Sequence, residues 1–198
     1  MRLIAVRHGE TSDNTKRILR GHGPGNLTKL GIKQAQALGS ILKKQKLDFI
    51  YCSDLKRCKE TLKEIKKYHQ HAPVIFTEQL RERNWGAFEG RPAKELWDKF
   101  EKEYKKPTLK FKPKNGESLQ ELRHRLADFL RYLKKNHERQ KILIVSHGGA
   151  LRALNSVLMR SSITKDTSTV KFHNTSISEY EIAGSKVKVH RFNEVKHL

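Results

Sequence analysis

Near its start the chain carries the octapeptide Arg2-Leu3-Ile4-Ala5-Val6-Arg7-His8-Gly9. Residues 3–6 are apolar, and a charged residue, Arg2 or Arg7, stands on either side of them. A short apolar run of this kind is typical of a strand that is buried on both faces. We therefore predict a buried strand over residues 2–6 that leads into His8 and Gly9.

A second run of the same design stands late in the chain. Residues 142–145 read Ile-Leu-Ile-Val and lead into Ser146-His147-Gly148-Gly149. Apolar residues then recur at helical spacing from Ala150 to Leu158. Two predicted strands therefore end at a histidine that precedes glycine.

Strands and helices alternate between these two runs. A capping box, Ser118-Leu119-Gln120-Glu121, marks the start of a helix that continues to Leu133. Apolar spacing and turn residues predict the remaining elements. These are strands at 49–52 and 74–76, helices at about 28–45, 55–69 and 92–104, and a terminal hairpin at 175–183 and 186–192.

Strands that alternate with helices need crossover connections, which place helices on both faces of a mainly parallel sheet. A length of 198 residues suits one domain with a sizeable core. Residues 105–114 contain two prolines and five lysines and are predicted to form an exposed connection. We predict an α/β fold, a three-layer α/β/α sandwich, in a single catalytic domain over residues 1–198.

The charge is strongly positive, because 42 Lys and Arg residues stand against 21 Asp and Glu, a formal net charge of +21. Such a charge attracts nucleic acid, membrane surfaces or phosphorylated metabolites without choosing among them. The cysteines, Cys52 and Cys58, lack the spacing of a disulfide framework or a zinc site. No apolar run is long enough for a signal peptide or a membrane span, so we expect a soluble, cytoplasmic protein.

Ligands of open α/β sheets bind beyond the carboxyl ends of the strands, where His8 and His147 are both expected. If their strands are neighbours, the two imidazoles meet in one pocket, beside the N-terminus of a helix. Arg7, and Arg57 at the start of another helix, add forked donors for phosphate oxygens. Nearby positive charges disfavour protonation of His8, which keeps it neutral and nucleophilic without a metal.

Cleavage of a phosphomonoester also needs a proton for the leaving oxygen. Glu82 follows the strand predicted at 74–76 and is our candidate, with Glu78, Glu89 and Glu95 as nearby alternatives. A basic loop is a candidate contact for a second anionic group of the substrate. It contains Lys16, Arg17, Arg20 and His22.

Several segments, in order along nearly the whole chain, resemble motifs of the histidine phosphatase, or phosphoglycerate mutase-like, superfamily. They are Arg7-His8-Gly9-Glu10 with Asn14, residues 53–61, residues 80–90, Gly116-Glu117-Ser118 and Ser146-His147-Gly148-Gly149. One Arg-His-Gly triplet is a weak signal, whereas this ordered set is specific. The resemblance implies a phosphoglycerate mutase-like fold.

The resemblance also implies roles for individual residues. His8 becomes the phosphorylated nucleophile, and Glu82 acts first as acid and then as base. Arg7, Arg57 and His147 hold the phosphoryl group and share in catalysis. The full set of implied substrate-binding residues is Arg7, Asn14, Arg57, His147 and Gly148.

The expected activity is that of a metal-independent phosphomonoesterase that acts on a small phosphorylated metabolite through a phosphohistidine, with no cofactor. The first alternative is a mutase of the phosphoglycerate mutase type, in which a second hydroxyl replaces water as the acceptor. Mutases of the superfamily tend to be longer over the site, and this chain is compact through 92–115, which favours hydrolysis. The second alternative is a basic protein that binds nucleic acid non-specifically, although no ordered aromatic platform supports it.

Overall fold

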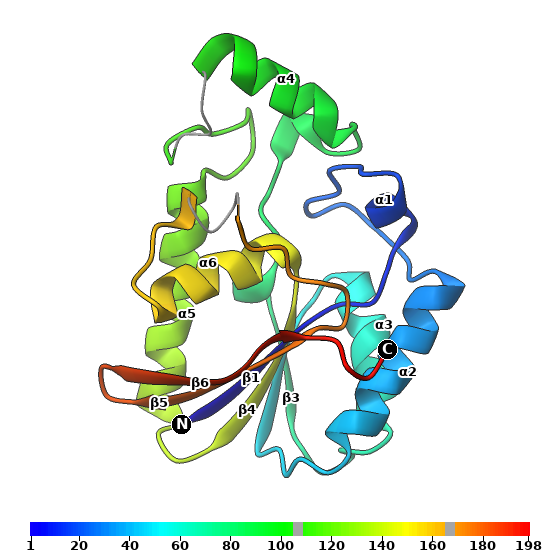
Figure 1. The fold of residues 1–198 in the computed structure, drawn as a ribbon, viewed down its shortest axis with the longest axis vertical. Helices are drawn as coiled ribbons and strands as arrows, with labels where there is room; N and C mark the ends of the chain where they lie inside the picture. Colours follow the sequence, from blue (N-terminus) through cyan, green and yellow to red (C-terminus); the bar gives the residue numbers. More distant parts are fainter. Residues whose placement is uncertain (105–108, 165–168) are drawn as a thin grey trace.

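Residues 1–104, 109–164 and 169–198 are described by a computed structural model of the protein (Figure 1). Their strands form a six-stranded sheet in the order β3-β2-β4-β1-β5-β6. The first four strands along the chain pair in parallel, and β5 runs antiparallel to both β1 and β6. The bounds are β1 Arg2–Arg7, β2 Phe49–Ser53, β3 Val74–Thr77, β4 Lys141–Ser146, β5 Ile177–Ala183 and β6 Lys186–Glu194.

The two strands that end at histidines are neighbours, as the pocket hypothesis requires. Their parallel register pairs Arg7 with Ser146, so His8 and His147 leave the sheet side by side. The His8 amide still donates to the Ser146 carbonyl at 3.0 Å. The sheet order thus places the predicted nucleophile at the centre of the carboxyl edge.

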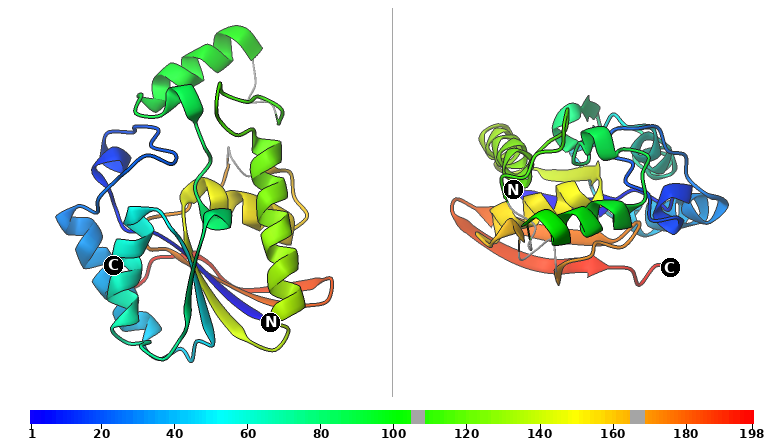
Figure 2. Two further views of the ribbon diagram at one scale, coloured as in Figure 1. Left: turned by 180° about the vertical axis from the view of Figure 1, so that it is seen from behind. Right: turned by 90° about the horizontal axis from the view of Figure 1, so that it is seen from above.

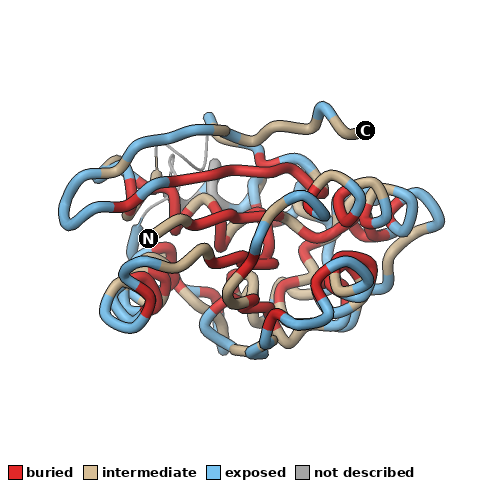
Figure 3. The backbone as a smooth tube through the Cα atoms, turned by 90° about the horizontal axis from the view of Figure 1, so that it is seen from below, coloured by how far each residue is buried: buried red, intermediate tan, exposed pale blue. Residues whose placement is uncertain are grey.

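Helices cover both faces of the sheet, which confirms the three-layer architecture (Figures 1 and 2). Leu3 and Ala5 of β1 pack against α5 and α6, whereas Ile4 and Val6 pack against α2 and α3. The buried backbone accordingly runs through the middle of the sheet (Figure 3). The helices are α2 Lys29–Leu42, α3 Lys56–Lys66, α5 Leu119–Asn136 and α6 Gly148–Leu158.

Helix starts agree with the prediction better than helix ends. Ser118 and Glu121 form the expected capping box, with the Glu121 amide 3.1 Å from the Ser118 hydroxyl. α2 ends at Leu42, before the predicted residue 45, because Leu42 is its last buried apolar position and residues 43 and 44 are exposed lysines. α3 similarly ends three residues before residue 69.

A small cap lies beyond the carboxyl edge of the sheet and contains α4 Ala93–Tyr104 (Figure 1). Leu96 of α4 is fully buried against Leu19, Trp85 and Phe88. Residues 105–108 of the predicted exposed connection lie outside the described residues, and residues 109–114 are largely exposed. Short helical turns link the cap to the sheet, namely α1 Ser12–Thr15, η1 Glu78–Leu80 and η2 Gly86–Phe88.

The cap is therefore attached to the sheet edge that carries both histidines. Within the described ranges, none of the helices is long and apolar enough to cross a membrane. The functional question accordingly concerns the space between the cap and the sheet edge.

Candidate active site

His8 is held in one tautomer by the backbone beside it. Its Nδ1 lies 2.7 Å from the Gly9 carbonyl oxygen, which can only accept, so Nδ1 carries the proton. Nε2 therefore keeps its lone pair. Burial first, and then the positive charges of Arg7 and Arg57, lower the pKa of His8 well below 6.5. His8 is a neutral imidazole with a free nucleophilic nitrogen at ordinary pH.

His147 lies next to it, with the two ring centroids 5.2 Å apart. Arg57 Nε donates to His147 Nδ1 at 3.1 Å, so Nε2 of His147 carries the proton and donates to Ser53 Oγ at 2.8 Å. Burial, followed by Arg57 and His8, lowers the pKa of His147 well below 6.5. The ring is fully buried, and each of its nitrogens is hydrogen-bonded within the protein.

These depressed pKa values make the fold sensitive to acid. Below pH 6.5 the unfolded chain protonates both histidines while the folded chain does not. The free energy of unfolding therefore decreases as the pH is lowered. Each histidine contributes a slope of about 1.4 kcal/mol per pH unit until the folded pKa is reached. Because the unfolded histidine is already half protonated at pH 6.5, we expect urea unfolding between pH 6.5 and 5.5 to show about 1 kcal/mol less loss of stability in His8→Asn than in the wild type. Equal losses in the two proteins would contradict the assignment.

Two arginines line the space in front of His8. Arg57 is buried, and it donates through Nη2 to the Gly21 carbonyl at 2.7 Å and through Nη1 to the Gly23 carbonyl at 3.2 Å. Arg7 donates through Nη1 to the Phe172 carbonyl at 2.8 Å. Its buried Nε finds no hydrogen-bond partner in the part of the chain that the structure describes. Forked cations fixed in this way are suited to the oxygens of a phosphoryl group.

Asn14 adds an uncharged donor to the same space. Its Oδ1 accepts from the Thr11 amide at 3.1 Å and from Asn174 Nδ2 at 3.1 Å. Because the oxygen is used in this way, Nδ2 is the group that Asn14 can offer to a ligand. Asn174 also donates to the His8 carbonyl at 3.0 Å, so one side chain orients both residues.

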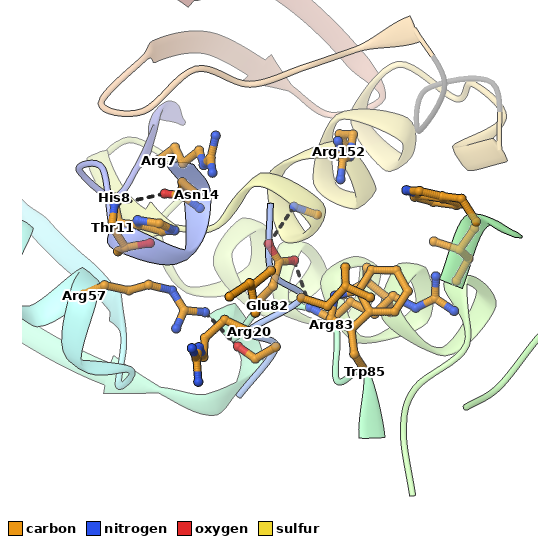
Figure 4. A pocket seen from close by; sticks show the side chains of 17 residues that line it. Arg7, His8, Thr11, Asn14, Arg20, Arg57, Glu82, Arg83, Trp85 and Arg152 are labelled. Carbon is orange, nitrogen blue, oxygen red and sulfur yellow. Dashed lines mark hydrogen bonds between the residues drawn. The ribbon is translucent and has the colours of Figure 1, made fainter. Parts of the chain in front are cut away.

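The Glu82 carboxylate is held by three backbone amides. Oε1 accepts from Arg83 at 2.8 Å and from Ala150 at 3.1 Å, and Oε2 accepts from Gly149 at 3.0 Å. Figure 4 shows the contacts with Arg83 and Gly149. Two of these amides belong to the first turn of α6, where the helix dipole favours a negative group. A Cβ atom at position 149 would lie 2.2 Å from Oε1, so only glycine lets the carboxylate approach α6 this closely.

A cavity of about 230 Å³ joins these groups (Figure 4). It is lined by five of the predicted site residues, namely Arg7, His8, Asn14, Arg57 and Glu82. The alternatives Glu78, Glu89 and Glu95 are not among its lining residues, and neither are His147 and Gly148. His147 instead accepts a hydrogen bond from Arg57 Nε, and Gly148 is the first residue of α6.

The basic loop does not present a row of free cations. Arg20 lines the cavity but forms an ion pair with Asp13, with Nε 2.9 Å from Oδ2. Lys16 and Arg17 are exposed and lie outside the lining, and His22 hydrogen-bonds through Nε2 to the Glu82 carbonyl at 2.9 Å. The loop therefore contributes more to the arrangement of the site than to the positive charge in the cavity.

Sequence reasoning missed several residues that this geometry uses. Ser53 directly follows the strand predicted at 49–52, although its contact with His147 was not predicted. Asn174 lies in an irregular segment with no periodic signal. Arg152 stands one helical turn after Gly148, a spacing that places both residues on one side of α6. The remaining additions are Trp85, Arg83 and Thr61, the last accepting from the Gly9 amide at 3.0 Å.

The site therefore combines a neutral imidazole, two fixed arginines and a carboxylate in one cavity. Such a set can receive a phosphoryl group on nitrogen and exchange a proton with the leaving oxygen. Over the described ranges, no group of three or more His, Cys, Asp or Glu side chains is placed to hold a metal ion.

Comparison with known proteins agrees with this chemistry. The chain is 33% identical to a metal-independent phosphoserine phosphatase of Arabidopsis thaliana, over 99% of this chain and 82% of the relative. It is 34% identical to the adenosylcobalamin/alpha-ribazole phosphatase of Escherichia coli, over 78% of this chain and 77% of the relative. The solved structure of Bacillus stearothermophilus YhfR superposes with a TM-score of 0.89 at 28% identity, over 99% of this chain and 98% of that one.

The family itself follows from the match along the chain. The family model described as histidine phosphatase superfamily (branch 1) matches residues 3–195. That span contains every residue that lines the cavity. The chain belongs to branch 1 of the histidine phosphatase superfamily.

Proposed function

We propose that this protein hydrolyses small phosphomonoesters by transferring the phosphoryl group first to His8 and then to water, without a metal ion. One observation carries the proposal: the free Nε2 of His8 shares a cavity with Arg7, Arg57 and the Glu82 carboxylate. The superfamily match, together with relatives named phosphatases, indicates phosphoric monoester hydrolase activity.

In the first step, His8 Nε2 attacks phosphorus in line with the leaving oxygen. A P–N bond forms, the P–O bond to the alcohol breaks, and Glu82 in its protonated form gives its proton to that oxygen. Arg7 and Arg57 stabilise the charge on the phosphoryl oxygens during the transfer. His147 is proposed to share in this support, either at the phosphoryl group or through Arg57.

In the second step, the Glu82 carboxylate takes a proton from water. The resulting oxygen attacks phosphorus, the P–N bond breaks, and inorganic phosphate leaves with His8 neutral again. Glu82 is then protonated and ready for the next ester. Asn14 Nδ2 and the amide of Gly148 are proposed as further donors to the phosphoryl group.

The names of relatives support a small phosphorylated substrate. They include phosphatases for phosphoserine and for alpha-ribazole, and a fructose-2,6-bisphosphatase of Xenopus tropicalis. A phosphoglycerate mutase-like protein of Arabidopsis thaliana, 34% identical over 99% of this chain, keeps the mutase reaction as the second candidate.

The test is a panel of phosphomonoesters with and without chelator. We expect release of inorganic phosphate at the same rate in both conditions and an acid-labile phosphoenzyme during turnover. The panel includes 3-phosphoglycerate with its bisphosphate activator, so that isomer formation in place of phosphate release would identify a mutase. Loss of activity with chelator, or salt-sensitive nucleic-acid binding with no turnover, would contradict the proposal.

We also propose that the reaction takes place in the cytoplasm. Cys52 and Cys58 are both buried free thiols, which suits a reducing compartment. Fractionation of cells that express the untagged protein tests this location, and recovery outside the cytoplasmic fraction would contradict it.

A further inference from the structure

Arg152 brings a further positive charge to the cavity that holds Arg7 and Arg57. It lies on α6, one turn after Gly148, and borders the same cavity as Glu82. Arg152 is partly buried. Within residues 1–104, 109–164 and 169–198, its buried Nε has no hydrogen-bond partner and its side chain pairs with no carboxylate. A buried N–H group without an acceptor is costly, which points to a ligand that supplies one.

Other cations around the cavity have partners. Arg20 is neutralised by Asp13. Arg83 is 4% exposed, donates through Nε to the Glu117 carbonyl at 2.8 Å and lies over the Trp85 ring at 4.2 Å. Carbonyl oxygens and the Trp85 ring orient Arg83, but they do not neutralise its positive charge.

Arg83 and Arg152 lie near enough to repel one another. Burial lowers the pKa of Arg83 to about 10, and the charge of Arg152 contributes to that lowering. In Figure 4, Arg152 and Arg83 stand on the side of the cavity that carries Trp85, while Arg7, His8 and Asn14 stand on the other. Burial also lowers the pKa of Arg7, and the charge of Arg152 contributes to that lowering. Arg152 therefore lies near both Arg7 and Arg83, where a second group of a substrate phosphorylated at His8 can reach it.

The cavity wall near this pair is apolar. Trp85, Trp97, Leu119 and Leu122 line the same cavity. An anionic group is held more strongly beside such a wall than in water, because the local dielectric constant is lower. Beside this wall, Arg83 and Arg152 attract a leaving group with its own negative charge more strongly than an uncharged alcohol.

We propose that Arg152, together with Arg83, binds a second anionic group on the leaving-group side of the substrate. The group is a carboxylate or a second phosphate, since both match the planar fork of arginine. This inference rests on the proposed function and narrows its substrate class to phosphomonoesters with two anionic groups.

The test uses matched substrates that differ in one group. The first pair is 3-phosphoglycerate and glycerol 3-phosphate, which exchange a carboxylate for a hydroxymethyl group. The second pair is 1,3-propanediol bisphosphate and 3-hydroxypropyl phosphate, which exchange a phosphate for a hydroxyl. The variants are Arg152→Gln, the charge-conserving Arg152→Lys, and Arg139→Gln as a control for net charge at an exposed position.

We expect the wild type to prefer the doubly anionic member of at least one pair. Arg152→Gln should lower kcat/KM for that member by about ten- to hundredfold, the usual effect of a lost charge-assisted hydrogen bond, and change the neutral member by less than about twofold. Arg152→Lys should keep part of the preference, and Arg139→Gln should keep all of it. The pair that responds identifies a carboxylate or a phosphate as the bound group.

An equal loss for both members of a pair in Arg152→Gln would overturn the proposal, and so would no loss for either. Turnover by the wild type without preference for an anionic member would overturn it while leaving the proposed function intact. If the wild type hydrolyses none of the four compounds, nor 4-nitrophenyl phosphate, the proposed function fails and this inference fails with it.

Discussion

The variant His8→Ala is expected to lose turnover by a factor of about 10⁴ or more, the order of loss that follows removal of a nucleophile. The free lone pair of His8 Nε2 has no substitute in the adjoining imidazole. His147 uses one nitrogen to accept from Arg57 and the other to donate to Ser53. Rapid quench after mixing with ³²P-labelled substrate measures both the rate and the labelled enzyme.

The label is expected on the wild type and not on His8→Ala. The matched control is His71→Ala, because His71 is exposed and lies outside the cavity lining. That variant should keep both the rate and the label. A label of wild-type size on His8→Ala, or a label that survives acid, would identify another nucleophile.

The fold could be predicted because the parallel strands β1, β2 and β4 are buried on both faces. Burial of this kind leaves unbroken apolar runs such as residues 142–145, which sequence reading recognises without knowing the partners. Helix ends were predicted less well. The end of α2 depends on where the chain turns toward Leu47, which is buried against the sheet, and no residue type marks that turn.

The candidate site could be predicted where a residue directly follows a strand or begins a helix. His8, His147 and Arg57 are residues of that kind. Asn174 and Arg152 are not, since they reach the site through tertiary packing of an irregular segment and of a helix side. A sequence shows that Arg20 is charged but does not show which residue pairs with it. The basic loop was therefore expected to offer Arg20 to the substrate, whereas Asp13 neutralises Arg20 in the structure.

The neutrality of His8 was predicted with an incomplete cause. Sequence reasoning invoked the neighbouring arginines, whereas burial is the larger influence on its pKa. Burial of a side chain at the end of a strand depends on the loops that close over it. Those loops include the segment around Asn174, which has no sequence signal of its own.

The variant Glu82→Gln is expected to separate substrates by their leaving groups. An alkyl phosphate such as glycerol 3-phosphate releases a strongly basic oxygen that needs a proton, so its kcat/KM should fall by about 10²- to 10⁴-fold. 4-Nitrophenyl phosphate releases a weakly basic phenolate, and its transfer to His8 should slow by less than about tenfold. Steady-state assays with both substrates measure the difference.

Hydrolysis of the phosphohistidine, the second step, tests whether Glu82 also acts as a base. Without the Glu82 carboxylate, attack of water on the phosphohistidine slows for every substrate. Glu82→Gln should therefore release a burst of about one equivalent of 4-nitrophenol and then turn over slowly while phosphoenzyme accumulates. Glu78→Gln is the matched control, because the Glu78 side chain is 73% exposed and paired with Arg81. Equal losses for both substrates, or slow turnover without a burst, would remove Glu82 from both roles.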